Sequence, residues 1–142
     1  PLENSSFLVS SANFNEKIHG KGFVARLSGS TAEFLQMWEL MMNGEKLFTM
    51  QDGTLTFKLA PAIPAYLVKD DGKVETTLFG KIKVVYDCGS KRDLIPGQYA
   101  VTKYELVAAD GSIESCEAAT VSGEAAQRIR DGKVAEIRVT IQ

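Results

Sequence analysis

Residues 31–43 carry the pattern that most restricts the fold, because they are apolar on nearly every side of a predicted helix. The pair Ser30 and Glu33 has the spacing of a capping box, which marks a helix start. The pair Asn43-Gly44 marks its end, since glycine tolerates the left-handed conformation past the last turn. The polar residues form one narrow stripe: Glu33, Gln36, Glu39 and Asn43. A surface helix has an apolar stripe instead, so this pattern predicts a helix buried in a larger body.

After residue 47 the periodicity changes to that of strands. Leu55, Phe57 and Leu59 alternate with polar residues, and further runs cover 73–79 and 81–86. Later runs cover 99–108, 112–118 and 137–141. The dipeptide Asp-Gly occurs four times between these runs and favours tight hairpin turns. We therefore predict a mainly β fold, an antiparallel β-sandwich over 47–142.

Two segments interrupt the predicted strands. The stretch 60–65, Ala-Pro-Ala-Ile-Pro-Ala, contains prolines that cannot donate to a central ladder. The stretch 122–130 predicts a short helix, with Ser122 as its cap and Ala125, Ala126 and Ile129 on one face.

Composition excludes several classes of protein. The chain has 142 residues, of which 44% are hydrophobic and 24% charged, so it is not a disordered tail. The formal net charge of -2 lacks the basic excess of nucleic-acid or membrane-surface proteins. No apolar run approaches the roughly 18 residues of a membrane span, and no secretory leader pattern is present. We expect a cytoplasmic protein with neither nucleic acid nor membrane as partner.

The single helix does not complete a helical domain. We therefore expect residues 1–46, an irregular segment and one buried helix, to be the end of a helical body. Residues 47–142 would then be a separate β domain. The chain begins with Pro1, and we expect it to be the C-terminal piece of a longer protein.

The candidate binding site lies at the predicted helix start, in Ser28, Gly29, Ser30 and Thr31. The first turn of a helix has unpaired amides and a partial positive charge, and glycine lets an anion approach the backbone. Hydroxyl groups add further donors. The pattern fits a phosphate site, and it equally fits a capping box with additional serines.

The segment Leu27-Ser28-Gly29-Ser30-Thr31-Ala32, followed by an apolar helix and Gly44, resembles the end of the catalytic barrel in glycoside hydrolase family 94. In that family the segment reads roughly Thr-Gly-Thr-Ala-Ala-Trp, and a strand ending in Ala/Asp-Pro-x-Ile-Pro follows. Residues 59–64 are similar to that strand end, and 78–81 match loosely the family's next aromatic-glycine turn. The resemblance covers about residues 26–86.

The resemblance implies an inverting glycoside phosphorylase with an (α/α)6 barrel and a C-terminal β-sandwich. In such enzymes inorganic phosphate attacks the anomeric carbon of a β-glucoside, and a carboxylic acid protonates the leaving oxygen. The implied partners are phosphate, a β-glucan oligosaccharide, and the rest of the parent chain or a second copy. The implied phosphate-binding residues are Ser28, Gly29, Ser30 and Thr31. No cofactor or metal is implied.

The chain also departs from the family pattern. Serine twice replaces threonine, and Thr31-Ala32-Glu33 stands where the family often has Ala-Ala-Trp, which favours the branch acting on 1,2-β-glucans. The catalytic acid lies upstream in the family, so we expect no catalytic residue in this chain, and whether the chain alone is an enzyme stays open. His19 either lines the site or is a solvated or structurally bonded histidine. Arg26 either adds charge to the anion site or pairs with Glu33.

The remaining chemistry-bearing residues have structural interpretations. Trp38 is expected in the core, and the four tyrosines either stack on sugar or pack in strands. Cys88 and Cys116 are expected as reduced, partly buried thiols, and no metal spacing accompanies them. Two alternatives to a phosphorylase remain: a free-standing carbohydrate-binding β-sandwich, and a bracing domain of a glycoside hydrolase.

Overall fold

A computed structural model describes residues 21–142, with side chains from Thr31 onward. The chain divides into two compact units, Pro1–Glu39 and Leu40–Gln142. The first unit is described only over Lys21–Glu39, which lies in helix α2 (Lys21–Asn43). The second unit contains the last turn of α2 and every described strand, so the β unit begins earlier than the expected boundary at 46/47. We refer to Leu40–Gln142 as the β unit.

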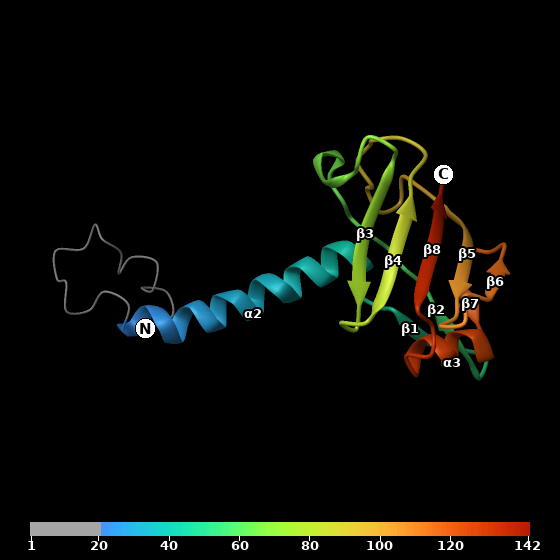
Figure 1. Ribbon diagram of the computed structural model, residues 1–142, viewed down its shortest axis with the longest axis horizontal. Coiled ribbons are helices and arrows are strands. Elements are labelled where there is room, and N and C mark those ends of the chain that lie inside the picture. Colours follow the sequence, from blue (N-terminus) through green and yellow to red (C-terminus); the bar gives the residue numbers. More distant parts are fainter. Residues whose placement is uncertain (1–20) are drawn as a thin grey trace. The chain divides into compact units, whose positions relative to one another are not determined.

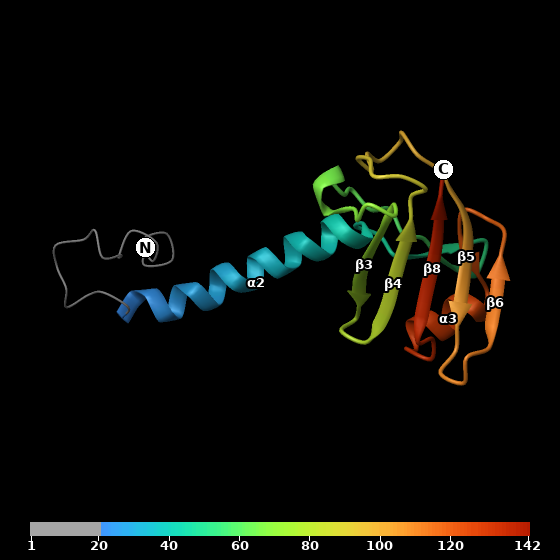
Figure 2. The same cartoon turned by 45° about the horizontal axis from the view of Figure 1, so that its top comes forward.

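The β unit contains two sheets. The smaller sheet has the order β1-β2-β7, formed by β1 (Phe48–Gln51), β2 (Thr54–Phe57) and β7 (Val121–Ser122). The larger has the order β3-β4-β8-β5-β6, and Figure 2 shows these strands side by side. Its bounds are β3 (Lys73–Leu78), β4 (Ile82–Asp87), β5 (Val101–Val107), β6 (Ile113–Cys116) and β8 (Glu136–Ile141). The fold is therefore mainly β, as predicted.

The prediction of a wholly antiparallel sandwich is wrong at one place. Strand β4 pairs with β8 in parallel, with Val84 opposite Ile137 and Tyr86 opposite Val139. The other described strand pairs are antiparallel. The larger sheet is thus mixed. The alternation of apolar residues shows which face of a strand is buried but not which direction the strand runs.

Tight turns join the local hairpins as expected. Asp52 and Gly53 both have positive φ, 51° and 77°, and connect β1 to β2. Asp110-Gly111 connects β5 to β6, and Phe79-Gly80 connects β3 to β4. The other Asp-Gly pairs do not form strand hairpins: Asp71-Gly72 precedes β3, and Asp131-Gly132 follows helix α3 (Glu124–Arg130).

The core lies where the two sheets meet. Phe57 of β2 contacts Tyr104 of β5 edge-on, with ring centroids 6.2 Å apart, and neither ring is exposed to solvent. Ala126 and Ile129 of α3 are also fully buried. Ser122 does not cap α3 as predicted: it lies in β7, and the N-cap is Gly123, which has no side-chain donor or acceptor. Figure 1 shows the order of the elements along the chain.

The segment after β2 leaves the sheet, as its prolines predict. Only an isolated bridge between Ile63 and Leu94 and the short 3-10 helix η2 (Ala65–Leu67) occur there. Both cysteines are free thiols, with Cys88 buried and Cys116 partly buried, which confirms the expectation.

Candidate functional site

The predicted phosphate-binding residues lie in the interior of helix α2. The helix begins at Lys21, so Ser28, Gly29, Ser30 and Thr31 are not at its N-terminus. In the interior of an α-helix the backbone amides donate to carbonyl groups one turn earlier. The prediction that a capping box starts the helix at Ser30 is therefore wrong for this chain. The phosphate contacts of these four residues stay a prediction, because they concern the parent protein.

The two site-lining candidates add nothing to this geometry. His19 lies outside the residues that the structure describes. Arg26 belongs to α2, but its side chain also lies outside the described part. Their proposed roles stay predictions.

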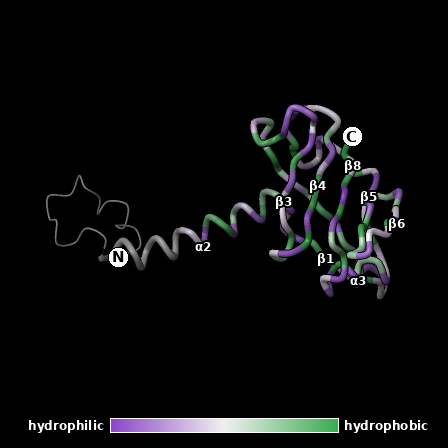
Figure 3. The backbone as a smooth tube through the Cα atoms, in the orientation of Figure 1, coloured by the Kyte–Doolittle hydropathy of each residue, from purple (hydrophilic) through white to green (hydrophobic). Residues whose placement is uncertain are grey.

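The exposed side of α2 is the feature that best fits an interaction site. Phe34, Leu35 and Met37 are 63%, 56% and 68% exposed, and Leu40 is also exposed. Within the described residues, the apolar side of α2 is thus incompletely covered at Phe34. Trp38 is half-buried and stacks on Phe34 with ring centroids 6.5 Å apart. In Figure 3 hydrophobic stretches occur along α2 as well as in the strands.

Within this chain, only the last turn of α2 is buried, and burial of the rest in a larger body stays a prediction. Met42 and Asn43 are 1% and 3% exposed, whereas residues 31–37 are exposed throughout. Large apolar side chains in water are unfavourable by about 25 cal/mol per Å² of apolar area. The side chains of α2 from Thr31 onward thus form an apolar surface that the other described residues leave exposed.

The end of α2 is fixed to the β unit by hydrogen bonds. The Tyr86 hydroxyl of β4 donates to the Met42 carbonyl at 2.7 Å and lies 3.4 Å from Asn43 Oδ1. The amides of Ala60 and Ala62 donate to the carbonyls of Asn43 and Met41, at 3.0 and 2.7 Å. The last turn of the helix is thus held by groups of the β unit.

Two more tyrosines bind the main chain of the segment that follows β2. The Leu59 amide donates to the Tyr104 hydroxyl at 3.0 Å, and the Tyr99 hydroxyl donates to the Pro61 carbonyl at 2.7 Å. Burial raises the pKa of Tyr99 and of Tyr104 to about 12, and it raises the pKa of Tyr86 well above 10. All three hydroxyls remain protonated, and uncharged, at neutral pH.

These contacts decide between the two roles predicted for the tyrosines. Tyr86 and Tyr104 are fully buried, Tyr99 is half-buried, and only Tyr66 among the four is exposed, at 78%. A carbohydrate-binding face needs a row of accessible rings, which the tyrosines do not supply. Tyr86, Tyr99 and Tyr104 are packing residues with hydrogen-bonded hydroxyl groups.

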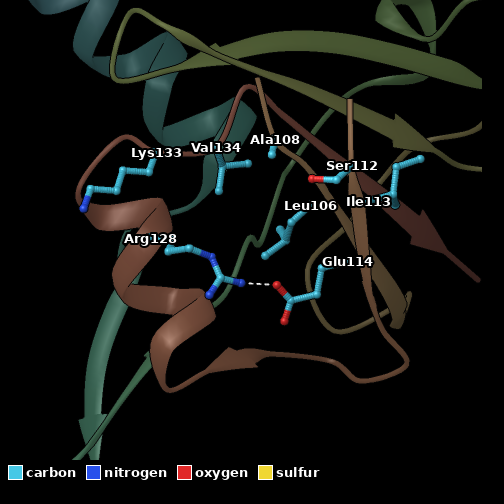
Figure 4. Close-up of a pocket in the computed structure, with 8 residues that line it drawn as sticks. All are labelled: Leu106, Ala108, Ser112, Ile113, Glu114, Arg128, Lys133 and Val134. Carbon is cyan, nitrogen blue, oxygen red and sulfur yellow. Dashed lines mark hydrogen bonds and ion pairs between the residues drawn. The ribbon is translucent and has the colours of Figure 1, made fainter. Parts of the chain in front are cut away.

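A surface pocket of about 380 Å³ lies between α3 and the β5–β6 hairpin (Figure 4). Leu106, Ala108 and Val134 supply its apolar wall. Figure 4 shows the Arg128 guanidinium pointing at the Glu114 carboxylate, with which it forms an ion pair. Because this pair neutralises itself and is solvent-exposed, it contributes little binding energy for a charged ligand.

The larger sheet carries paired opposite charges on its exposed face. Lys83 lies 3.7 Å from Glu75, and Arg138 lies 3.1 Å from Glu136. Within residues 21–142, no group of three or more His, Cys, Asp and Glu side chains is arranged to hold a metal ion. No helix in the same part of the chain is long and apolar enough to cross a membrane.

Comparison of the chain with protein-family models, with curated proteins and with solved structures found no match. The site is therefore defined by its own geometry: an apolar helix surface that the described part of the chain leaves exposed, and a helix end held in a β unit.

Proposed function

We propose that this chain is the C-terminal part of a family-94-like inverting glycoside phosphorylase. In the parent, α2 would pack as a helix of the catalytic barrel, and the β unit would brace it. One observation carries the proposal: Phe34, Leu35 and Met37 are exposed on a helix whose end is built into a β unit. Burial in a helical body accounts for that apolar surface.

The resemblance of residues 26–86 supplies the chemistry. The parent would bind a β-linked gluco-oligosaccharide and inorganic phosphate, and phosphate would attack the anomeric carbon as the glycosidic oxygen leaves. A carboxylic acid from the preceding part of the parent would protonate that oxygen. This chain would contribute the phosphate contacts of Ser28, Gly29, Ser30 and Thr31.

Such contacts require a local change in α2. The helix would have to begin near Thr31, so that the amides of Ser28, Gly29 and Ser30 become free to donate to phosphate. Serine, glycine and threonine are weak helix formers, so unwinding at this point costs little backbone energy. We propose that barrel packing and phosphate together select the shorter helix.

The test is a phosphorolysis assay on the longest product of the gene that encodes this chain. Release of sugar 1-phosphate from β-1,2- and β-1,4-linked gluco-oligosaccharides is measured against phosphate concentration. Gly29→Val should raise the apparent phosphate constant about tenfold or more, because a side chain there holds the anion off the backbone. Gln36→Val, which places the same side chain on an exposed position further along α2, is the control.

Two results would overturn the proposal. One is cleavage of the oligosaccharides at equal rates with and without phosphate, which assigns the parent to the glycoside hydrolases. The other is an unchanged phosphate dependence in Gly29→Val at matched stability.

A further inference from the structure

The last four residues of α2 have an unusually complete set of hydrogen-bond partners. A helix normally leaves its final carbonyl groups without intrahelical donors. Here the Leu40 carbonyl accepts from the Gly44 amide at 2.9 Å, and the Met41 carbonyl accepts from the Ala62 amide at 2.7 Å. The carbonyls of Met42 and Asn43 accept from the Tyr86 hydroxyl and the Ala60 amide. Every terminal carbonyl is therefore capped.

Among the described residues, the turns of α2 formed by residues 31–37 have no comparable support from burial. Residues 31–37 are exposed, so side-chain burial does not hold them in a helix. The last turn contains no basic residue that would stabilise the negative end of the helix dipole. Starting a helix in water is unfavourable, with a nucleation constant of about 10⁻³, whereas extending an existing turn is not. A preformed last turn thus removes the unfavourable step.

Tyr86 links this cap to the folded sheet. It lies in β4 between Val74 of β3 and Val139 of β8, and its side chain is fully buried. In the paired sheet its hydroxyl donates to the Met42 carbonyl at 2.7 Å. The amides of Ala60 and Ala62 belong to the segment after β2. Tyr104 and Tyr99 fix the main chain of this segment through hydrogen bonds to Leu59 and Pro61.

We propose that the β unit is a folding template for α2. The folded strands cap the last turn of the helix, and residues 31–39 are helical because they extend that turn. Tyr86 couples strand β4 to the last turn. The proposal concerns the chain itself. It does not depend on a phosphorylase parent.

The first experiment measures amide hydrogen exchange in the whole chain. Tyr86→Phe removes the hydroxyl that caps α2 while keeping the ring. It should speed exchange of amides 31–43 about tenfold relative to the slowest amides of β5 and β8. Thr56→Val is the matched control, because it removes a hydroxyl that bonds Thr49 within the smaller sheet and makes none of the contacts that cap α2. It should leave the α2 amides at the wild-type ratio.

A second experiment needs no variant. Trp38 is the sole tryptophan and lies in α2, so its fluorescence reports on the helix during denaturant unfolding. Near-ultraviolet circular dichroism of the buried tyrosines reports on the β unit. If the β unit is the template, the Trp38 fluorescence of the folded helix should be lost at the same denaturant concentration as the circular dichroism of the tyrosines, or at a lower one.

Either of two results would overturn the template. In one, Tyr86→Phe and Thr56→Val change the exchange of the α2 amides equally. In the other, far-ultraviolet helix signal and Trp38 fluorescence persist after the tyrosine signal has disappeared. Both results leave the phosphorylase proposal untouched, since that rests on phosphate dependence.

Discussion

Gly44 ends α2 in a conformation that other residues adopt at a cost. Its φ is +98°, and a Cβ atom there would lie 3.1 Å from the Cβ, N and O atoms of Ala60. The Ala60 amide is the donor that caps Asn43, so Ala60 has little freedom to move. Any side chain at position 44 would thus strain the backbone and also press against Ala60.

We predict that Gly44→Ala lowers the free energy of unfolding by more than the roughly 1–2 kcal/mol expected for left-handed backbone alone. Gly53→Ala is the control: Gly53 has a φ of +77°, but open space surrounds it. Denaturant unfolding of both variants measures the difference. Equal losses would show that the contact with Ala60 relaxes without cost.

Tyr104 makes stability depend on alkaline pH. In the unfolded chain a tyrosine ionises near pH 10, whereas burial raises the pKa of folded Tyr104 to about 12. The folded state therefore retains a proton that the unfolded state has lost. The contribution is fully present below pH 10 and disappears as the pH rises to 12. It amounts to about 2–3 kcal/mol.

We predict that Tyr104→Phe is less stable than wild type at neutral pH but loses less stability between pH 9 and 11.5. The neutral-pH loss arises because the Leu59 amide is left without its acceptor. Unfolding midpoints across that pH range test this, with Tyr66→Phe at an exposed position as the control. A slope identical to wild type in Tyr104→Phe would contradict it.

At the scale of elements, α2 shows why sequence fixes one end of a helix better than the other. Asn43-Gly44 ends the helix as predicted, because a left-handed glycine is a local requirement. Ser30 and Glu33 have the spacing of a helix start, but the same residues are tolerated inside a helix that continues through 21–27. A capping-box sequence therefore allows a helix to start but does not require it, whereas a left-handed glycine does end the helix.

Gly29 provides a test that separates this chain from its proposed parent. In the helix interior Gly29→Ala should favour α2 by up to about 1 kcal/mol, since glycine is the poorer helix former. Far-ultraviolet circular dichroism of the chain should therefore show more helix. In a phosphorylase parent the same substitution should weaken phosphate binding. Unchanged helicity would mean that α2 begins after Gly29 in solution.

The positions of the Asp-Gly hairpin turns could be predicted from the sequence, but the surroundings of the tyrosine side chains could not. Asp52-Gly53 and Asp110-Gly111 determine their turns through positive φ, a property that the sequence shows directly. Whether a strand tyrosine faces solvent or core depends on which strands surround it, and that is decided by long-range pairing. Tyr86 gave no local signal that its hydroxyl would cap a helix 43 and 44 residues away.

At the scale of the whole molecule, the stability of shortened chains can locate the boundary between the two units. The compact unit begins at Leu40, whereas the sequence predicted a domain from residue 47. A chain of residues 40–142 keeps Met42, which is 1% exposed, and the partner of the Tyr86 hydroxyl. A chain of residues 47–142 loses both.

We predict that the 40–142 chain has nearly the stability of the full chain, and that the 47–142 chain is less stable by about 2–5 kcal/mol. That is the usual range for deleting a large buried side chain, here Met42. Denaturant unfolding of the three chains compares them directly. Equal stability of the two shorter chains would place the boundary after the helix.

The parallel pairing of β8 with β4 could not be foreseen, because alternation along a strand carries no direction. It has a consequence for the order of synthesis. β8 is made after the other strands of the larger sheet and occupies its middle, between two hairpins that precede it in the chain. Until β8 has emerged from the ribosome, the β3–β4 and β5–β6 hairpins have no common neighbour, and each carries an open edge that invites pairing with other chains. Only β8 closes that gap.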